Sequence, residues 1–209
     1  YTAGYSYFYQ EQWDNARQWF SQYLAKEPDK KSNLYYDALN RIGDCYFYRR
    51  DFRNAVDAYS KVSVSNSTDV DYALYQKAFI KGLQKKYGEE IADLQRLIKK
   101  YPNSVYAPKA QYEIGRAYVL QNKYSKAIEE YNTVLTNYPQ TPIARKAILE
   151  TGMLYENMGQ NDMAIVAYKK VVERYPGSEQ TNVALESMQN LYVDKNDVSA
   201  YIKYTKSHG

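Results

Sequence analysis

The sequence has little of the chemistry that catalysis and metal binding require. Its 209 residues include one cysteine, Cys45, and one histidine, His208. These are too few for a zinc site or for a Ser-His or Cys-His nucleophile. The nine glycines are scattered, with no glycine-rich loop that would hold a phosphate. We therefore expect a protein that is not an enzyme and that has no cofactor and no metal.

Long apolar runs and a strong excess of one charge are also missing. The mean hydropathy is −0.74, and no segment is apolar for long enough to form a transmembrane helix. The 28 basic and 24 acidic residues leave a net charge of +4, too even a balance to indicate a nucleic-acid partner. A lone cysteine indicates no redox compartment. Because Tyr1 falls inside what reads as a repeat helix, we expect the chain to be a fragment of a longer protein.

What the chain does have is an internal repeat of 37 residues. In its clearest copy a glycine is followed by tyrosine after three residues, alanine after 12, a second tyrosine after 16 and proline after 24. This copy comprises Gly115, Tyr118, Ala127, Tyr131 and Pro139. The same residue types recur 37 residues on, at Gly152, Tyr155, Ala164, Tyr168 and Pro176. A fixed period of this length indicates a solenoid, in which each repeat packs on its neighbours and builds a long surface.

Weaker copies extend the repeat over the whole chain. Gly4 and Gly43 begin two earlier copies, Ala78 takes the glycine position of a third, and Tyr192 anchors a degenerate last one. The six predicted repeats cover approximately residues 1–28, 32–67, 69–102, 105–139, 142–176 and 179–207. Since such repeats stack into one elongated body, we expect a single superhelical domain over 1–209.

These spacings resemble the tetratricopeptide repeat, in which a small residue, an aromatic, alanine, an aromatic and proline follow one another in this order. The resemblance implies an all-α, right-handed superhelix of antiparallel helix pairs, truncated in its first repeat and degenerate in its last. The family's usual period is 34 residues. The extra residues lie between the proline and the next glycine, which indicates a first helix lengthened by about one turn.

The resemblance also implies a compartment. The segment 101–110, with the sequence YPNSVYAPKA, is similar to the repeat variant found in bacterial cell-envelope proteins, including outer-membrane-assembly lipoproteins and periplasmic cell-division coordinators. It therefore favours a periplasmic or outer-membrane-associated protein, with the cytoplasm as the alternative.

The function implied by the resemblance is a non-catalytic scaffold that binds a segment of a partner protein along its concave face. In this fold the first helix of each pair lines that face. The residues turned toward the face lie three positions before the glycine, and one and four positions after it. The predicted groove residues are Tyr5, Phe8, Asn40, Asp44, Phe47, Tyr72, Tyr75, Phe79, Lys109, Tyr112, Arg116, Lys146 and Met153. Tyrosine and arginine are the residues that most often anchor interfaces.

The predicted groove is aromatic toward the N-terminus and basic toward the centre. Lys109, Arg116 and Lys146 would attract an acidic segment of a partner. Some members of the family grip a C-terminal carboxylate with Lys and Asn at set positions of the groove. This chain does not reproduce that clamp, because the corresponding positions carry Asn40 and Asp44, and then Tyr75 and Phe79.

Two readings of the aromatic residues stay open. The repeat pattern places about half of the 26 tyrosines in the packing between helices. The rest either bind a partner or pack on one another along lengthened first helices. The competing function is accordingly structural: a spacer or self-association module whose aromatic surfaces stack on other repeats of a larger protein.

Overall fold

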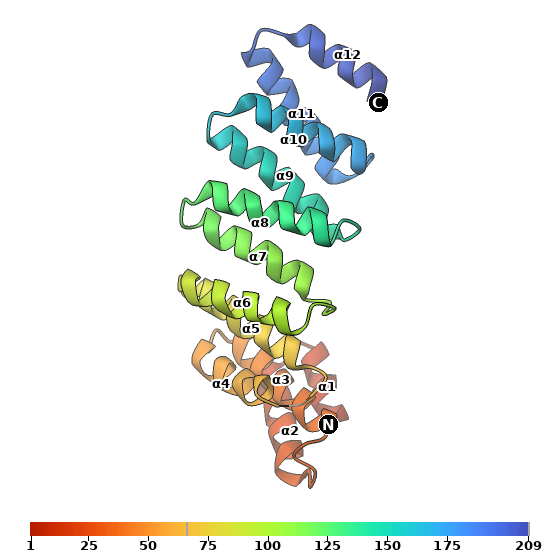
Figure 1. Ribbon diagram of the computed structural model, residues 1–209. Coiled ribbons are helices and arrows are strands. Elements are labelled where there is room, and N and C mark those ends of the chain that lie inside the picture. The colour runs from red at the N-terminus through yellow and green to blue at the C-terminus, as the bar shows by residue number, and fades with distance from the viewer. Residues whose placement is uncertain (66, 209) are drawn as a thin grey trace. The chain divides into compact units, whose positions relative to one another are not determined.

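The computed structural model describes residues 1–65 and 67–208, and these residues form twelve α-helices and no strand (Figure 1). The helices are α1 (Thr2–Tyr9), α2 (Trp13–Lys26), α3 (Asn33–Tyr48), α4 (Phe52–Ser63), α5 (Val70–Leu83), α6 (Tyr87–Lys100), α7 (Ala107–Val119), α8 (Tyr124–Asn137), α9 (Pro142–Asn157), α10 (Asn161–Arg174), α11 (Glu179–Asp194) and α12 (Val198–His208). Each predicted repeat contains one consecutive pair of helices. The prediction of an all-α solenoid of helix pairs is confirmed.

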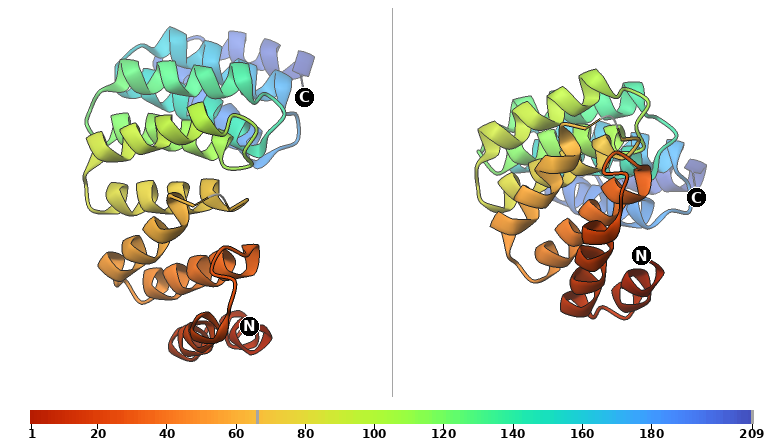
Figure 2. Two further views of the ribbon diagram at one scale, coloured as in Figure 1. Left: turned by 60° about the horizontal axis from the view of Figure 1, so that its bottom comes forward. Right: turned by 90° about the horizontal axis from the view of Figure 1, so that it is seen from below.

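The helices gather into two compact units, Tyr1–Ala110 and Gln111–Gly209, called here the N-terminal and C-terminal units. In the N-terminal unit each helix from α1 to α5 packs on the next along the chain, so that the series ends at α6 (Figure 2). In the C-terminal unit the same holds from α8 to α12. Helix α7 crosses the boundary between the units, and its Gly115 packs on α8. The single domain expected over 1–209 remains a prediction.

Four of the helix pairs are held by an aromatic ring that covers the glycine of the first helix. A Cβ atom added to Gly43 would lie 2.5 Å from the ring of Tyr59, and one added to Gly4 would lie 2.8 Å from the ring of Phe20. The same contact joins Gly115 to Tyr131 in the C-terminal unit. All three rings are completely buried. The glycines of the repeat are therefore needed for close packing, since any side chain there would displace a core ring.

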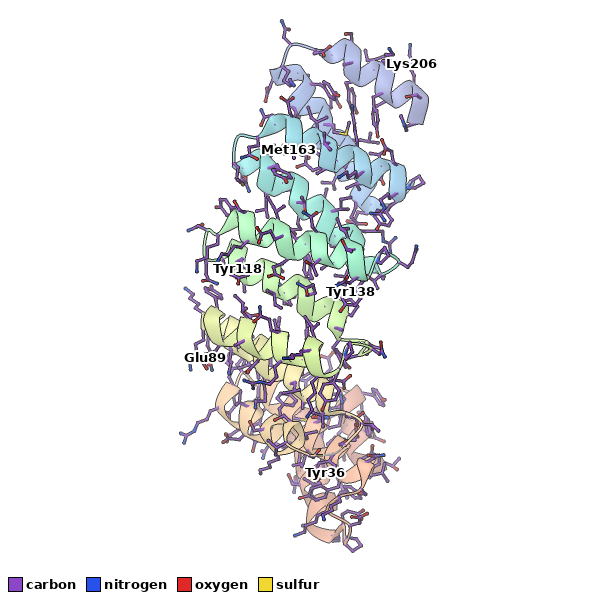
Figure 3. The ribbon with its side chains drawn as sticks, in the orientation of Figure 1. Tyr36, Glu89, Tyr118, Tyr138, Met163 and Lys206 are labelled. Carbon is purple, nitrogen blue, oxygen red and sulfur yellow. The ribbon has the colours of Figure 1, made fainter. Side chains whose placement is uncertain are left out.

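The tyrosines that follow the glycine by three residues are less buried than these rings. Tyr118 is half-buried near the end of α7, whereas Tyr138 follows the last residue of α8, at the opposite end of the helix pair (Figure 3). Tyr131, between them in sequence, has no exposed surface. In these repeats the aromatic of the second helix thus lies at the centre, and that of the first helix lies at the edge.

A second feature with the same period appears in the turn inside each helix pair. One residue in every such turn has a left-handed backbone, with φ between 57° and 70°. These residues are Glu11, Arg50, Lys85, Asn122, Gly159 and Asn196. Only Gly159 adopts this conformation without a steric cost from Cβ, although asparagine tolerates it better than other residues do.

We expect Lys85→Gly to raise the free energy of unfolding by about 0.5–1 kcal/mol, because it removes the Cβ clash of a left-handed residue at a helix end. The Lys85 side chain is exposed and its amide donates to the Gly82 carbonyl at 2.8 Å, a bond that glycine keeps. Urea unfolding measures the change. The matched control is Gly159→Ala, which is expected to lower stability by a similar amount. Shifts of the same sign in both variants would contradict this account.

Candidate functional site

Five aromatic rings of the N-terminal unit form one continuous series, called here the aromatic stripe. Phe47 of α3 contacts Phe79 of α5, with ring centroids 6.1 Å apart, and Phe79 stacks on Tyr75 at 6.3 Å. Tyr75 stacks on Tyr106 at 5.5 Å, and Tyr106 contacts Tyr72 at the same distance. All five rings are half-buried. The structure thus brings four of the predicted groove residues together and adds Tyr106, from the connection before α7.

A buried ion pair holds one end of this stripe in place. Arg41 Nη1 lies 2.6 Å from Asp44 Oδ2. The hydroxyls of Tyr59 and Tyr72 both donate to Asp44 Oδ1, at 2.6 and 2.5 Å. The guanidinium of Arg41 also lies over two rings, 5.1 Å from the centroid of Tyr72 and 5.7 Å from that of Phe8. Asp44, a predicted groove residue, is only 3% exposed and acts here as an internal acceptor that orients Tyr72.

The protonation of this cluster follows from its burial and its charges. Burial raises the pKa of Asp44, while Arg41 and the hydroxyls of Tyr59 and Tyr72 act in the opposite direction. Asp44 in turn favours the charged form of Arg41, so that the pKa of the guanidinium is raised despite its burial. The pKa of Tyr59 is raised by burial and by Asp44. Because the pKa values of Tyr59 and Tyr72 are both raised, the two hydroxyls are neutral at pH 7 and donate to Asp44 beside the guanidinium of Arg41.

Asn40 is the second predicted groove residue that the fold places inside. It has no exposed surface, and neither atom of its side-chain amide has a hydrogen-bond partner among the described residues. Unpaired buried amides are rare because each costs free energy on folding. A partner lying on the surface of the unit would not reach this side chain.

Tyr5 and Phe8 connect α1 to the rest of the N-terminal unit. The hydroxyl of Tyr5 donates to Asp37 Oδ2 at 2.6 Å, and that of Tyr1 donates to the same oxygen at 2.5 Å. The other oxygen of Asp37 lies 3.4 Å from Arg41 Nε. Burial, together with Asp37, raises the pKa of Tyr1 to about 12. The carboxylate of Asp37 therefore joins α1 to α3 through two neutral hydroxyls.

Of the three basic residues predicted for the centre of the groove, Arg116 has a carboxylate partner. In the C-terminal unit Arg116 pairs with Glu113 at 2.9 Å, and the hydroxyl of Tyr112 donates to Glu150 Oε1 at 3.3 Å. The ring of Tyr112 stacks on Tyr131, with centroids 5.3 Å apart. Of the remaining predicted residues, Lys109 and Lys146 are exposed, and Met153 packs half-buried against the core of the C-terminal unit.

Sequence reasoning missed Tyr106 and Arg41 for different reasons. The residue 37 positions after Tyr106 is Ile143, so no repeat signal selects this position. Arg41 lies two residues before Gly43. The predicted groove residues lie three before, and one and four after, the glycine, so Arg41 is not among them. The available signal for Arg41 was its spacing of three residues from Asp44, which places the two side chains on one helix face.

The described residues offer little else that could act chemically. Among them no group of three His, Cys, Asp or Glu side chains could hold a metal ion. None of the described helices combines the length and the apolar character needed to cross a membrane. Cys45 is 1% exposed, and burial raises the pKa of its thiol to about 12, so the reactive thiolate does not form at neutral pH.

Comparison with known proteins identifies the architecture. Two family models, both described as tetratricopeptide repeat, match this sequence. One covers residues 1–69, and the other covers 72–104, 109–141 and 146–178. The chain belongs to the tetratricopeptide repeat family. Tetratricopeptide repeats build extended surfaces on which other proteins bind. A search of curated proteins found no match to this sequence.

Solved tetratricopeptide repeat structures share the fold. The C-terminal part of a repeat protein from Cytophaga hutchinsonii has a TM-score of 0.74 at 18% identity, over 98% of this chain and 80% of that one. A repeat protein from Parabacteroides merdae has a TM-score of 0.68 at 17% identity, over 99% and 77%. The crystal structure of MamA has a TM-score of 0.65 at 24% identity, over 82% and 93%. At these identities the likeness shows the solenoid fold.

Proposed function

We propose that this chain is a non-catalytic scaffold that binds an extended or helical segment of a partner protein along the first helices of its repeats. The observation that carries the proposal is the aromatic stripe, in which five half-buried rings from α3, α5 and the connection before α7 lie in unbroken contact. Aromatic side chains anchor interfaces because they cover a large area with few rotatable bonds.

The stripe is also suited to binding because its rings are already held in place. Tyr72 is oriented by its hydrogen bond to Asp44 and by the guanidinium of Arg41. Tyr75 lies between Phe79 and Tyr106. Binding to rings that are already ordered costs less conformational entropy than binding to rings that must first become ordered.

Charge and compartment complete the proposal. Lys109, Arg116 and Lys146 favour a partner with acidic residues where it passes α7 and α9, and the counter-charges Glu113 and Glu150 moderate this preference. The similarity of residues 101–110 to repeats of bacterial envelope proteins supports a place in a cell-envelope complex, in the periplasm or at the outer membrane.

A second candidate function is self-association or stacking on further repeats, and one observation favours it. Three apolar side chains near the end of the chain are exposed: Val193 (53%), Val198 (43%) and Ile202 (47%). A following repeat or a second copy would cover such side chains in a solenoid. Light scattering over a concentration series tests this alternative, and a constant monomer mass would count against self-association.

The scaffold proposal is tested by selecting binders from a random peptide library and measuring their affinity by fluorescence anisotropy. We expect the double variant Tyr75→Ala, Phe79→Ala to bind the selected peptides at least tenfold more weakly, because the variant lacks the middle of the stripe. The control is Trp19→Ala on α2, an aromatic that is 41% exposed but lies outside the stripe, and it should leave affinity unchanged.

Circular dichroism and melting curves accompany these measurements. If the double variant loses its helical signal, the rings are primarily structural, and Tyr75→Phe with Phe79→Leu then tests binding in a folded protein. Peptides that bind all these variants as tightly as the wild type would refute the proposal.

A further inference from the structure

An acidic cleft opens beside the aromatic stripe, within the N-terminal unit. Its volume is about 280 Å³, near the lower end of small-ligand pockets and of a size for one long side chain. Its walls come from α3, from the first turn of α5 and from the connections that precede α5 and α7. The lining residues that matter here are Asp37, Arg41, Asp69, Asp71, Tyr72 and Tyr106.

The charges of this cleft do not balance. Three carboxylates line it, and Arg41 is its one basic lining residue. Arg41 is already engaged, since its guanidinium lies 2.6 Å from Asp44 and 3.4 Å from Asp37. Within the described part of the chain no basic side chain forms an ion pair with Asp69 or Asp71. Neither carboxylate therefore has a cation of its own, and Arg41 acts on Asp69 only from beyond ion-pair distance.

The individual contacts of the two carboxylates support this picture. Asp71 Oδ2 accepts a hydrogen bond from the hydroxyl of Ser104 at 2.5 Å, and its Oδ1 accepts one from the backbone amide of Tyr72 at 2.8 Å. Asp69 accepts one long hydrogen bond, from the hydroxyl of Thr68 at 3.5 Å. Asp69 is the N-cap residue of α5, but its side chain makes no capping hydrogen bond to the helix. Burial and the neighbouring carboxylates of Asp37 and Asp71 raise the pKa of Asp69. A positive group in the cleft would relieve this repulsion.

Two of the cleft's walls are aromatic. Tyr72 and Tyr106 contact each other with centroids 5.5 Å apart and rings inclined by 55°. Both rings also belong to the aromatic stripe, so the cleft is continuous with the surface on which the partner is proposed to lie. Carboxylates beside aromatic faces suit a guanidinium, which forms paired hydrogen bonds in its plane and stacks on rings.

We propose that the cleft receives an arginine side chain of the partner segment, whose neighbouring residues rest on the aromatic stripe. This inference rests on the proposed scaffold function and specifies the chemistry of the partner. The guanidinium pairs with Asp69 and Asp71 and stacks on Tyr106. A partner segment therefore carries a basic residue where it passes α5.

The test uses the peptides selected from the random library. We expect them to share an arginine at one fixed position. Replacing that arginine by citrulline, which has the same shape but no charge, should weaken binding about tenfold, and Asp69→Asn should do the same. Because both changes remove one interaction, combining them should cost little more than either alone. The weakening by Asp69→Asn should also shrink at high salt.

The matched control is Asp57→Asn, the same change of charge at an exposed position of α4 in the same unit, which should leave affinity unchanged. Asp69→Asn has no ion pair to lose and keeps a side chain that can cap α5, so its melting temperature should not fall. Asp37 and Asp71 are left intact because they hold Tyr1, Tyr5 and Ser104.

The outcomes separate the two proposals. Peptides that need Tyr75 and Phe79 but share no basic position, or that place an acidic residue at the cleft, would overturn this inference and leave the scaffold function standing. Equal effects of Asp69→Asn and Asp57→Asn would also overturn it. Peptides that are indifferent to the stripe and the cleft alike would overturn both.

Discussion

Asp44→Ala is expected to lower the free energy of unfolding by about 3–5 kcal/mol, the usual cost of removing one partner from a buried ion pair. The substitution leaves the guanidinium of Arg41 with Asp37 alone, at 3.4 Å. It also leaves the hydroxyls of Tyr59 and Tyr72 without their shared acceptor. Each unpaired buried group adds its own desolvation cost.

Chemical denaturation, followed by circular dichroism, measures this loss. The matched control is Asp57→Ala at an exposed position of α4, which should change stability by less than about 0.5 kcal/mol. A second variant identifies the cause: Asp44→Leu combined with Arg41→Met removes both charges, and should recover much of the stability that Asp44→Ala loses. A loss below about 1 kcal/mol for Asp44→Ala would mean that the ion pair is solvated and does not organise the unit.

Gly115→Leu should lower the free energy of unfolding by about 2–3 kcal/mol through overpacking. A Cβ atom at this position would collide with the ring of Tyr131, which is fully buried and stacked on Tyr112. The better helix propensity of leucine returns only about 1 kcal/mol. Urea unfolding measures the effect, together with the fluorescence of the displaced tyrosines.

Gly88→Leu is the control for this prediction. Gly88 lies in the first turn of α6, and a Cβ atom there would meet nothing within 4 Å. The same substitution should therefore be neutral or stabilising, by up to about 1 kcal/mol. If both glycine variants were equally stable, the crossing of α7 and α8 would be looser than the Gly115–Tyr131 contact indicates.

Much of the fold was predictable because its central contacts are local. Gly115 and Tyr131 lie 16 residues apart, and the same spacing joins Gly43 to Tyr59. A contact that recurs at one spacing in four of the repeats gives the sequence a periodic pattern. The left-handed turn residues give a weaker pattern in the sequence, because the turn accepts Glu11 and Lys85 as well as glycine.

The candidate site was predictable only in part. Phe47, Tyr75 and Phe79 occupy repeat positions that face outward from the first helices, and the structure brings them into contact. Asn40 and Asp44 occupy equivalent positions but are buried. Position in the repeat specifies which face of a helix a residue occupies. It does not specify what the neighbouring helices place against that face.

The sequence by itself determined the helix pairs, their period and the glycine–aromatic crossings, because these depend on spacings within one repeat. Only the tertiary structure decided that Asp44 pairs internally with Arg41, that Tyr106 completes the aromatic stripe and that Asp37, Asp69 and Asp71 share one cleft. The stripe and the cleft join residues from different repeats and from connections without periodicity. Arg41 and Asp44 lie three residues apart on α3, but Asp44 is enclosed by Tyr59 of α4 and Tyr72 of α5. Their chemistry arises from burial and from charges brought together, which no spacing along the chain records.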